Sequence, residues 1–255
     1  MSVEAPKTHE AQSLTLSIVI PAKNESGNIK PLIDEIRSAC DDGIDYELIY
    51  VDDGSTDSTF DELKAIRDDG MANLRVIQHQ QSTGQSTAII SGARIARGQW
   101  LVVLDADGQN DPADIPGMLA SVQNAHEQNP QVVGVIGHRV NRRDDIVKRV
   151  SSKVANGFRD MMLRDGIPDT GCGLKAVIRE RYMALPYFNH MHRYIPTLIQ
   201  SQGFEMMVHP VNHRPRMAGT SNYGVWNRLW VGLVDVLGVV WLKRRAKVIK
   251  VKQIL

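Results

Sequence analysis

The chain has 255 residues, of which 42% are hydrophobic and 23% charged, and its formal net charge is +1. This length and composition are typical of a folded protein with one large domain or one and a half, and they exclude a disordered or fibrous chain. The two cysteines match no zinc-binding or Cys-x-x-Cys spacing, so we expect free thiols in a reducing, cytoplasmic setting. We expect no export signal, because the first apolar run, Leu14–Ile20, ends early at Pro21.

The charged residues are divided unevenly along the chain. Up to His138 there are 9 Lys and Arg against 21 Asp and Glu, and from Arg139 onward there are 21 against 8. This division predicts an acidic half that can hold a metal and a basic half that faces phosphates on a nucleotide, a nucleic acid or a lipid. A nucleic-acid partner is disfavoured, because the basic half has no helix-turn-helix signal and no aromatic-interleaved platform.

Strands and helices alternate in the first half of the chain. Apolar runs predict strands at Leu14–Ile20, Glu47–Val51, Leu74–Ile77 and Trp100–Leu104. Helices are predicted at Ile29–Ala39, Thr59–Asp68 and Thr87–Ala96. The alternation predicts an α/β fold, with a Rossmann-like, mostly parallel central sheet flanked by helices.

The run Trp100–Leu104 ends in two carboxylates one residue apart, Asp105 and Asp107, followed by the amide of Gln109. These oxygens are ligands that suit Mg²⁺ or Mn²⁺, with substrate phosphates completing the shell. A solvated acidic turn is the alternative. The loops that hold Glu25, Asp53 and Asp107 should meet at one edge of a parallel sheet.

Neither of the common glycine-rich phosphate loops is present. No Gly-x-Gly-x-x-Gly follows the first strand, and no Gly-x-x-x-x-Gly-Lys-Ser/Thr occurs anywhere in the chain. Carboxylates bind hydroxyl and NH groups directly and reach phosphates only through a metal. This chemistry favours a nucleotide-sugar over ATP.

Four motifs occur in a characteristic order: Pro21-Ala-Lys-Asn-Glu25, Val51-Asp-Asp-Gly-Ser55, Gly84 with the helix after it, and Asp105-Ala-Asp107. Together they resemble the family 2 glycosyltransferases with the GT-A fold. Within that family, the chain is most similar to the dolichyl-phosphate mannose synthase-like polyprenyl-phosphate glycosyltransferases. The resemblance covers roughly residues 16–242, nearly the whole chain.

The resemblance implies a donor site built mainly from the first half of the chain, with Arg139 added. It assigns the nucleoside to Pro21, Lys23, Glu25, Val51 and Asp53, where Lys23 replaces a residue that is often aromatic in relatives. It assigns the sugar diphosphate and the Mg²⁺ or Mn²⁺ ion to Asp105, Ala106, Asp107, Gln109 and Arg139, the last of these in the fifth strand, Val132–Arg139.

The second half is expected to carry the acceptor chemistry. Lys148, Arg149 and Lys153 are expected to face an acceptor phosphate, with a solvated helix face as the alternative. The segment Pro168–Lys175 resembles one below the sugar site, where Asp169 is a catalytic or positioning carboxylate or else a structural cap. His192-Arg193 resembles a His-Arg pair of bacterial relatives, and a surface pair is the alternative.

The segment Val211–Gly224 resembles a mobile Arg-x-x-Gly-x-Ser-Lys loop that closes over the donor diphosphate. Arg216 matches the arginine of that loop, and guanidinium binds phosphate in a bidentate way. Asn222 stands where relatives commonly have lysine. One phosphate contact is therefore either missing or supplied by Arg214.

The stretch Val225–Leu242 is apolar, but Asn227, Arg228 and Asp235 within it argue against a membrane span. Trp226, Trp230 and Trp241 suit a lipid headgroup region, and six positive charges follow within Lys243–Lys252. These features predict an interfacial helix and basic tail that dock on anionic lipid. A core helix packed on the main domain is the alternative.

The predicted organisation is one catalytic domain, 1–224, with a donor half at 14–138 and an acceptor half at 139–224, followed by a membrane-associating segment at 225–255. The predicted function is inverting transfer of a sugar from a GDP- or UDP-linked donor to a polyprenyl phosphate, on the cytoplasmic face of a membrane. Alternatives are a hydroxyl acceptor, which needs a general base, or a non-catalytic binding module. Whether the protein is a homo-oligomer is left open.

Overall fold

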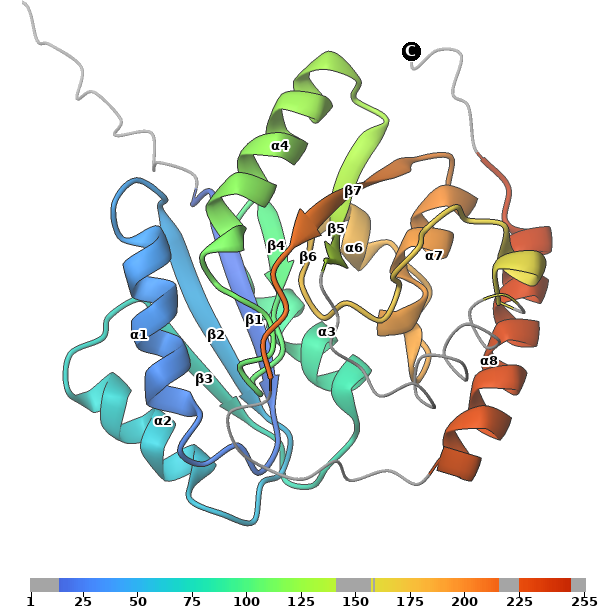
Figure 1. Ribbon diagram of the computed structural model, residues 1–255. Helices are drawn as coiled ribbons and strands as arrows, with labels where there is room; N and C mark the ends of the chain where they lie inside the picture. Colours follow the sequence, from blue (N-terminus) through green and yellow to red (C-terminus); the bar gives the residue numbers. More distant parts are fainter. Residues whose placement is uncertain (1–13, 141–156, 158, 216–224, 249–255) are drawn as a thin grey trace, which may run out of the picture.

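The computed structural model describes residues 14–140, 157, 159–215 and 225–248, with side chains omitted for 225–231. Within these residues, seven strands form one sheet in the order β3-β2-β1-β4-β6-β5-β7 (Figure 1). All neighbouring pairs are parallel except those of β6, which is antiparallel to β4 and β5. The strands are β1 Leu16–Ala22, β2 Tyr46–Asp52, β3 Leu74–Gln78, β4 Trp100–Val103, β5 Val132–Arg139, β6 Lys175–Ile178 and β7 Glu205–Val211. The predicted mixed α/β architecture with a mostly parallel sheet is confirmed.

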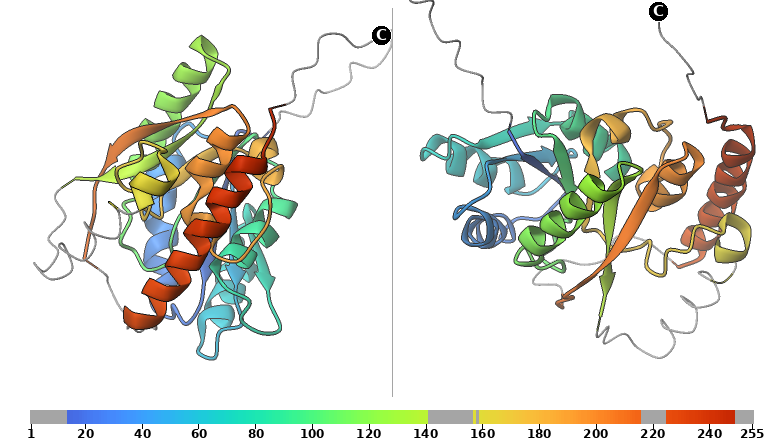
Figure 2. Two further views of the ribbon diagram at one scale, coloured as in Figure 1. Left: turned by 90° about the vertical axis from the view of Figure 1, so that its right-hand side faces the viewer. Right: turned by 90° about the horizontal axis from the view of Figure 1, so that it is seen from above.

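The helices cover both faces of this sheet. They are α1 Ile29–Cys40, α2 Thr59–Asp68, α3 Gln85–Ile95, α4 Asp114–Gln128, α6 Arg179–Met183, α7 Ile195–Ser201 and α8 Val225–Arg245, with a 3₁₀ turn, η1, at Met191–Arg193. Figure 2 shows α1 and α4 on one face and α3, α6 and α7 on the other. Because helices cover both faces, every residue of β2 and β4 is buried.

Pro21 does not end the first strand, in contrast to the prediction. Strand β1 continues to Ala22, and Pro21 is in register with Val51 of β2. The pairing of β1 with β4 ends at Val19, whose carbonyl accepts the N–H of Leu104. Backbone groups of residues two apart in a strand point to the same neighbouring strand, so an N–H at position 21 would point toward β4, as the carbonyl of Val19 does. At position 21, however, β4 is no longer paired with β1. The proline therefore removes no hydrogen bond from the sheet.

The helix α8 runs across the outside of the molecule (Figure 2). It packs against α7 and buries Val236 and Val239. Asp235 also faces the protein, where its carboxylate lies 2.9 Å from Nδ1 of His190. In the part of the chain that is described, no helix has both the length and the apolarity needed to cross a membrane.

Candidate active site

The candidate site lies at the carboxyl ends of three adjacent parallel strands, β2, β1 and β4. The loops that follow these strands begin at Lys23, Asp53 and Leu104. Because the strands run in the same direction, the three loops share one edge of the sheet. This is the edge at which open α/β sheets bind ligands.

The first two loops are joined through Asn24. Its backbone N–H donates to Oγ of Ser55 at 2.9 Å, and its side-chain oxygen accepts the N–H of Thr56 at 2.8 Å. Asn24 has φ 54, a left-handed conformation that asparagine adopts more readily than most residues. The backbone N–H of Glu25 donates to Oγ1 of Thr59 at 2.9 Å. The Pro-Ala-Lys-Asn-Glu motif therefore fixes the two predicted nucleoside loops against each other.

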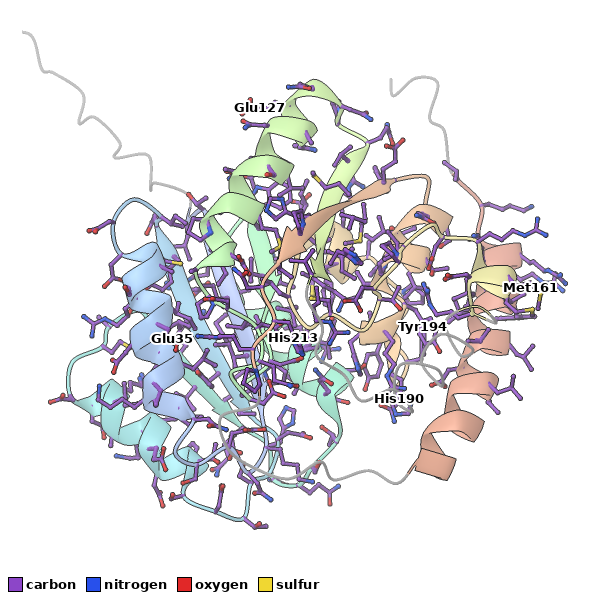
Figure 3. All side chains as sticks on the ribbon, viewed as in Figure 1. Glu35, Glu127, Met161, His190, Tyr194 and His213 are labelled. Carbon is purple, nitrogen blue, oxygen red and sulfur yellow. The ribbon has the colours of Figure 1, made fainter. Side chains whose placement is uncertain are left out.

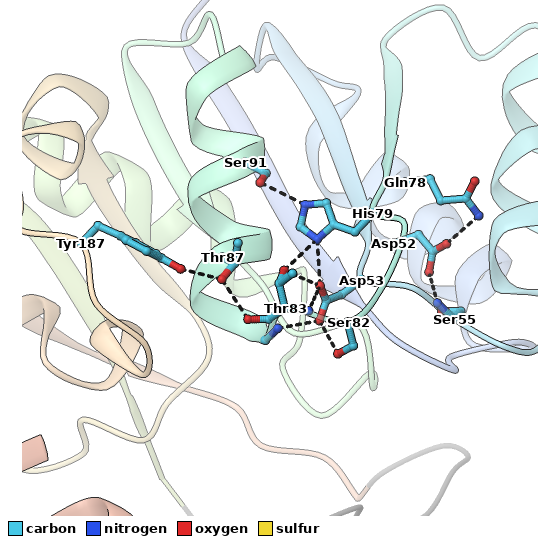
Figure 4. A network of polar contacts seen from close by, with 11 residues as sticks. Asp52, Asp53, Ser55, Gln78, His79, Ser82, Thr83, Thr87, Ser91 and Tyr187 are labelled. Atoms are coloured by element: carbon cyan, nitrogen blue, oxygen red, sulfur yellow. Dashed lines mark hydrogen bonds and ion pairs between the residues drawn. The ribbon is translucent and has the colours of Figure 1, made fainter. Parts of the chain in front are cut away.

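Asp53 organises a further loop, residues 79–84, which follows β3 and leads into α3 (Figure 4). One carboxylate oxygen accepts the N–H of Thr83 at 2.9 Å and lies 2.8 Å from Nδ1 of His79. The other accepts the hydroxyl of Ser82 at 2.8 Å and the N–H of Gly84 at 2.9 Å. Burial raises the pKa of Asp53, but these hydrogen bonds outweigh it and lower the pKa to about 2. Asp53 is therefore ionised and holds residues 79–84 in place.

Gly54 allows this loop to approach the end of β2. A Cβ at Gly54 would lie 2.7 Å from the backbone of Gln81 and Ser82, and the residue has φ +68. Only glycine combines that conformation with that contact. This close approach gives a structural reason for glycine in the Asp-Asp-Gly-Ser motif.

Asp105 and Asp107 lie directly after β4. Oδ1 of Asp105 accepts a hydrogen bond of 2.8 Å from the amide of Gln85, the first residue of α3. Asp107 is 8% exposed, and its Oδ1 accepts the N–H of Gln109 at 3.1 Å. Burial raises the pKa of Asp105, and the charge of Asp107 raises it further. Two acids are thus held close together, where a cation would stabilise their ionised forms.

Two cations lie next to these acids. The guanidinium of Arg139 pairs with both carboxylate oxygens of Asp169, with Nε···Oδ2 and NH2···Oδ1 both at 2.7 Å. Lys175 is buried at the start of β6, where its ammonium donates to the carbonyl of Cys172. The charges of Arg139 and Lys175 both lower the pKa of Asp105. Asp105 after β4, Arg139 at the end of β5 and Lys175 at the start of β6 therefore form one cluster of interacting charges.

The two adjacent carboxylates fit a divalent cation with oxygen ligands, such as Mg²⁺ or Mn²⁺. Asp105 and Asp107 would hold it, and the predicted third ligand, Gln109, follows in the same loop. Among the described residues, no group of three or more His, Cys, Asp or Glu side chains could hold a metal ion.

Gly173 provides the space that Asp105 occupies. A Cβ at Gly173 would overlap Oδ2 of Asp105 and would lie 2.8 Å from Nδ2 of Asn110. We expect Gly173→Ala to displace the Asp105 carboxylate and to raise the Mn²⁺ concentration needed for half-maximal activity by about tenfold or more. The measurement is a metal titration of activity together with a thermal melt.

The matched control for this prediction is Gly117→Ala in α4, where an added Cβ meets nothing within 4 Å. We expect it to leave the metal titration unchanged and to stabilise the fold by about 0.5–1 kcal/mol, since alanine is the better helix former. An unchanged metal requirement in Gly173→Ala would show that Asp105 does not need its present position.

The other predicted site residues are distributed as follows. Val51 and Ala106 are buried, Pro21, Glu25 and Gln109 are partly exposed, and Lys23 is exposed. The predicted acceptor residues Lys148, Arg149 and Lys153 lie outside the described residues, as do Arg216 and Asn222. Their assignments remain predictions.

Sequence reasoning missed Gln85 and treated His192 only as part of a pair. Nδ1 of His192 lies 2.8 Å from the hydroxyl of Ser86, next to Gln85 at the start of α3. Burial lowers the pKa of His192 well below its usual value, so the ring is neutral at pH 7. No spacing in the sequence indicated these contacts, because His192 and Ser86 are 106 residues apart.

Comparison with known proteins identifies the family of this chain. The family model described as "Glycosyl transferase family 2" matches residues 17–185. A dodecaprenyl-phosphate galacturonate synthase of Rhizobium johnstonii is 33% identical over 91% of this chain and 68% of its own length. An undecaprenyl-phosphate 4-deoxy-4-formamido-L-arabinose transferase of Edwardsiella ictaluri is 31% identical over 82% of this chain. This chain spans 63% of the latter relative, less than two thirds.

A solved structure supports the fold. Glucosyl-3-phosphoglycerate synthase of Mycobacterium tuberculosis, in complex with Mn²⁺, UDP-glucose and phosphoglyceric acid, matches 90% of this chain and 79% of its own chain. The TM-score is 0.66 at 20% sequence identity, which supports the GT-A fold and no more. The family match covers well over half of the chain. The chain belongs to glycosyl transferase family 2.

Proposed function

We propose that this protein transfers a sugar from a nucleotide-sugar, UDP- or GDP-linked, to a polyprenyl phosphate, with inversion at the anomeric carbon. The observation that carries the proposal is the pair Asp105 and Asp107 directly after β4, with the charge of Arg139 close enough to lower the pKa of Asp105. The names of both relatives specify polyprenyl-phosphate sugar transfer, which supports this class of acceptor.

The chain's own residues suggest how the reaction proceeds. Asp105 and Asp107 would hold Mg²⁺ or Mn²⁺, and the bound metal supplies positive charge that stabilises the departing nucleoside diphosphate. Arg139, oriented by Asp169, adds a fixed positive charge close to Asp105. An oxygen of the acceptor phosphate forms the new bond to the anomeric carbon, and the electron pair of the broken bond leaves with the diphosphate.

The acceptor phosphate needs positioning more than activation. It is already an anion near pH 7, so a strong general base is dispensable. We assign Lys148, Arg149 and Lys153 to holding this phosphate in line with the bond that breaks, and Arg216 to the donor diphosphate. Asp169, through its ion pair with Arg139, then has a positioning role.

The test is incubation of the purified protein with Mg²⁺ or Mn²⁺ and a panel of labelled UDP- and GDP-sugars, with and without undecaprenyl phosphate. We expect metal-dependent transfer of label into the organic phase. Release of nucleoside diphosphate without lipid label would contradict the lipid acceptor and point to a hydroxyl acceptor. If no donor in the panel turned over, the transferase proposal would fail and a binding module would be favoured.

We further propose that α8 docks on an anionic membrane surface, where a polyprenyl phosphate resides. Val234, Leu237 and Trp241 are 56%, 52% and 60% exposed and lie on one face, at spacings of three and four residues. Asp235, in contrast, faces the protein and pairs with His190. An apolar face directed outward, followed by a basic helix end, is the pattern of an interfacial helix.

We expect Leu237→Glu to lower binding to phosphatidylglycerol vesicles by about tenfold, because a charge would enter the apolar contact. The control, Ala72→Glu, adds the same charge at an exposed position of the donor half and should bind like wild type. Vesicle co-sedimentation measures both variants, and phosphatidylcholine vesicles test the contribution of lipid charge. Equal binding by the two variants would exclude α8 as the contact.

A further inference from the structure

Two backbone carbonyls of the loop that carries Asp105 and Asp107 accept hydrogen bonds from outside the loop. Within the loop, Asp107 accepts the N–H of Gln109. The carbonyl oxygens of Gln109 and Asn110 instead accept hydrogen bonds from a segment about one hundred residues later in the chain. The position of this loop therefore depends on that distant segment.

The segment is Asn212–Arg214, directly after β7, and we call it the strap. The backbone N–H of Arg214 donates to the carbonyl of Gln109 at 2.9 Å, and its guanidinium donates to the carbonyl of Asn110 at 3.2 Å. His213 forms an antiparallel bridge with Asn110. The strap thus contacts the loop through both backbone and side chain.

The strap is itself fixed at two points on the donor half. Asn212 donates from its backbone N–H and its side-chain amide to the two carboxylate oxygens of Asp114, at 2.7 and 3.0 Å. The guanidinium of Arg214 pairs with Glu35 of α1, with NH1···Oε1 at 3.2 Å and NH2···Oε2 at 2.6 Å. Figure 3 shows Glu35 and His213 on neighbouring segments.

We propose that Arg214 and Glu35 are positioning residues, which set the metal affinity of the loop that holds Asp105 and Asp107. This inference rests on the proposed function of that loop. Arg214 joins the loop to α1 because one side chain contacts both Glu35 and the carbonyl of Asn110. Partners that orient metal ligands without touching the metal commonly change metal affinity by about 10–100-fold.

Arg214 has Glu35 as its ion-pair partner, whereas the sequence had suggested the diphosphate of the sugar donor. Both terminal nitrogens of its guanidinium donate to Glu35, and this hydrogen bonding raises the pKa of Arg214. A contact with the donor diphosphate would have to replace this ion pair. A positioning role therefore fits the observed contacts better than supply of the phosphate contact missing at Asn222.

Mn²⁺ binding, measured by the electron paramagnetic resonance signal of free Mn²⁺ with and without UDP or GDP, tests the proposal on the whole 255-residue chain. We expect Arg214→Ala and Glu35→Gln to raise the half-saturating Mn²⁺ concentration by about tenfold. Arg214→Lys should give an intermediate half-saturating Mn²⁺ concentration, because lysine keeps the positive charge but cannot form the bidentate contact of a planar guanidinium.

Arg75→Ala is the matched control. Arg75 is 33% exposed, against 31% for Arg214, and it too donates to a carboxylate and to a backbone carbonyl, those of Glu47 and Ile95. Arg75 and Glu47 lie near the amino-terminal ends of β3 and β2, whereas the candidate site lies at the carboxyl ends of the strands. We expect Arg75→Ala to lower the melting temperature about as much as Arg214→Ala does while leaving Mn²⁺ binding unchanged.

The outcomes separate this inference from the proposed function. Wild-type binding by both Arg214→Ala and Glu35→Gln would overturn the strap proposal while leaving the metal site intact. An equal loss of Mn²⁺ affinity in Arg75→Ala would also overturn it, because the effect would then be one of general stability. If wild-type protein bound no Mn²⁺ even with UDP or GDP, the proposed metal-dependent function would fail, and the strap proposal with it.

Discussion

Asp107→Asn is expected to reduce sugar transfer by about a thousandfold. The substitution keeps the size of the side chain and its acceptor oxygen but removes the negative charge that would hold the metal. Loss of one preorganised group that stabilises developing charge commonly costs about 100- to 1,000-fold in rate, and loss of a metal ligand belongs at the upper end. The measurement is the initial rate of metal-dependent transfer to undecaprenyl phosphate at saturating donor.

The matched control is Asp111→Asn in the same loop. Asp111 accepts the N–H of Ala113 just before α4, at 3.0 Å, and has no assigned role in the site. We expect it to retain nearly full activity, with a small loss of stability from the weakened helix start. Transfer by Asp107→Asn within tenfold of wild type would contradict a metal-binding role for Asp107.

The second large effect is expected at Asp169. Asp169 and Arg139 are 7% and 14% exposed and form a two-point ion pair. Replacement of one member of a buried ion pair commonly costs about 3–5 kcal/mol. We expect Asp169→Asn to lie at the lower end, about 3 kcal/mol, because asparagine can still accept one hydrogen bond from Arg139. Chemical denaturation measures this change in the free energy of unfolding.

The same variant separates positioning from base catalysis. If Asp169 orients Arg139, Asp169→Asn should keep measurable transfer to a polyprenyl phosphate, with a loss of about 10- to 100-fold and an unchanged pH profile. A loss as complete as that of Asp107→Asn would instead show that Asp169 takes part in the chemistry. Glu47→Gln, which disturbs the ion pairs of the buried Glu47 carboxylate with Arg75 and Arg97 away from the site, should lower stability without lowering the activity of the folded protein.

The strands and helices of the first half could be predicted well from the sequence, since they depend on local patterns. The helix Thr59–Asp68 is confirmed at both ends, and the strand Val132–Arg139 likewise. Most of the other predicted elements differ by one or two residues at their ends. The continuation of β1 through Pro21 could not be predicted, because it depends on which neighbouring strand has diverged at that point.

The supporting contacts of the site were harder to predict. The sequence placed Asp105 and Asp107 after a buried strand, but it did not indicate that Gln85 would bond to Asp105 or that Gly173 would make room for it. Gly173 lies 68 positions from Asp105 in the sequence, and Gln85 lies 20 positions away. Such contacts arise only when strands of a sheet are ordered in space.

The sequence by itself determined the alternation of strands and helices, the family and the carboxylates at the strand ends, because hydrophobic periodicity and motif spacing are local properties. Only the tertiary structure decided that Arg214 pairs with Glu35, that Asp169 pairs with Arg139, and that Asp235 of α8 faces the protein. These choices depend on long-range packing, since a side chain finds its partner only after the sheet has brought distant segments together.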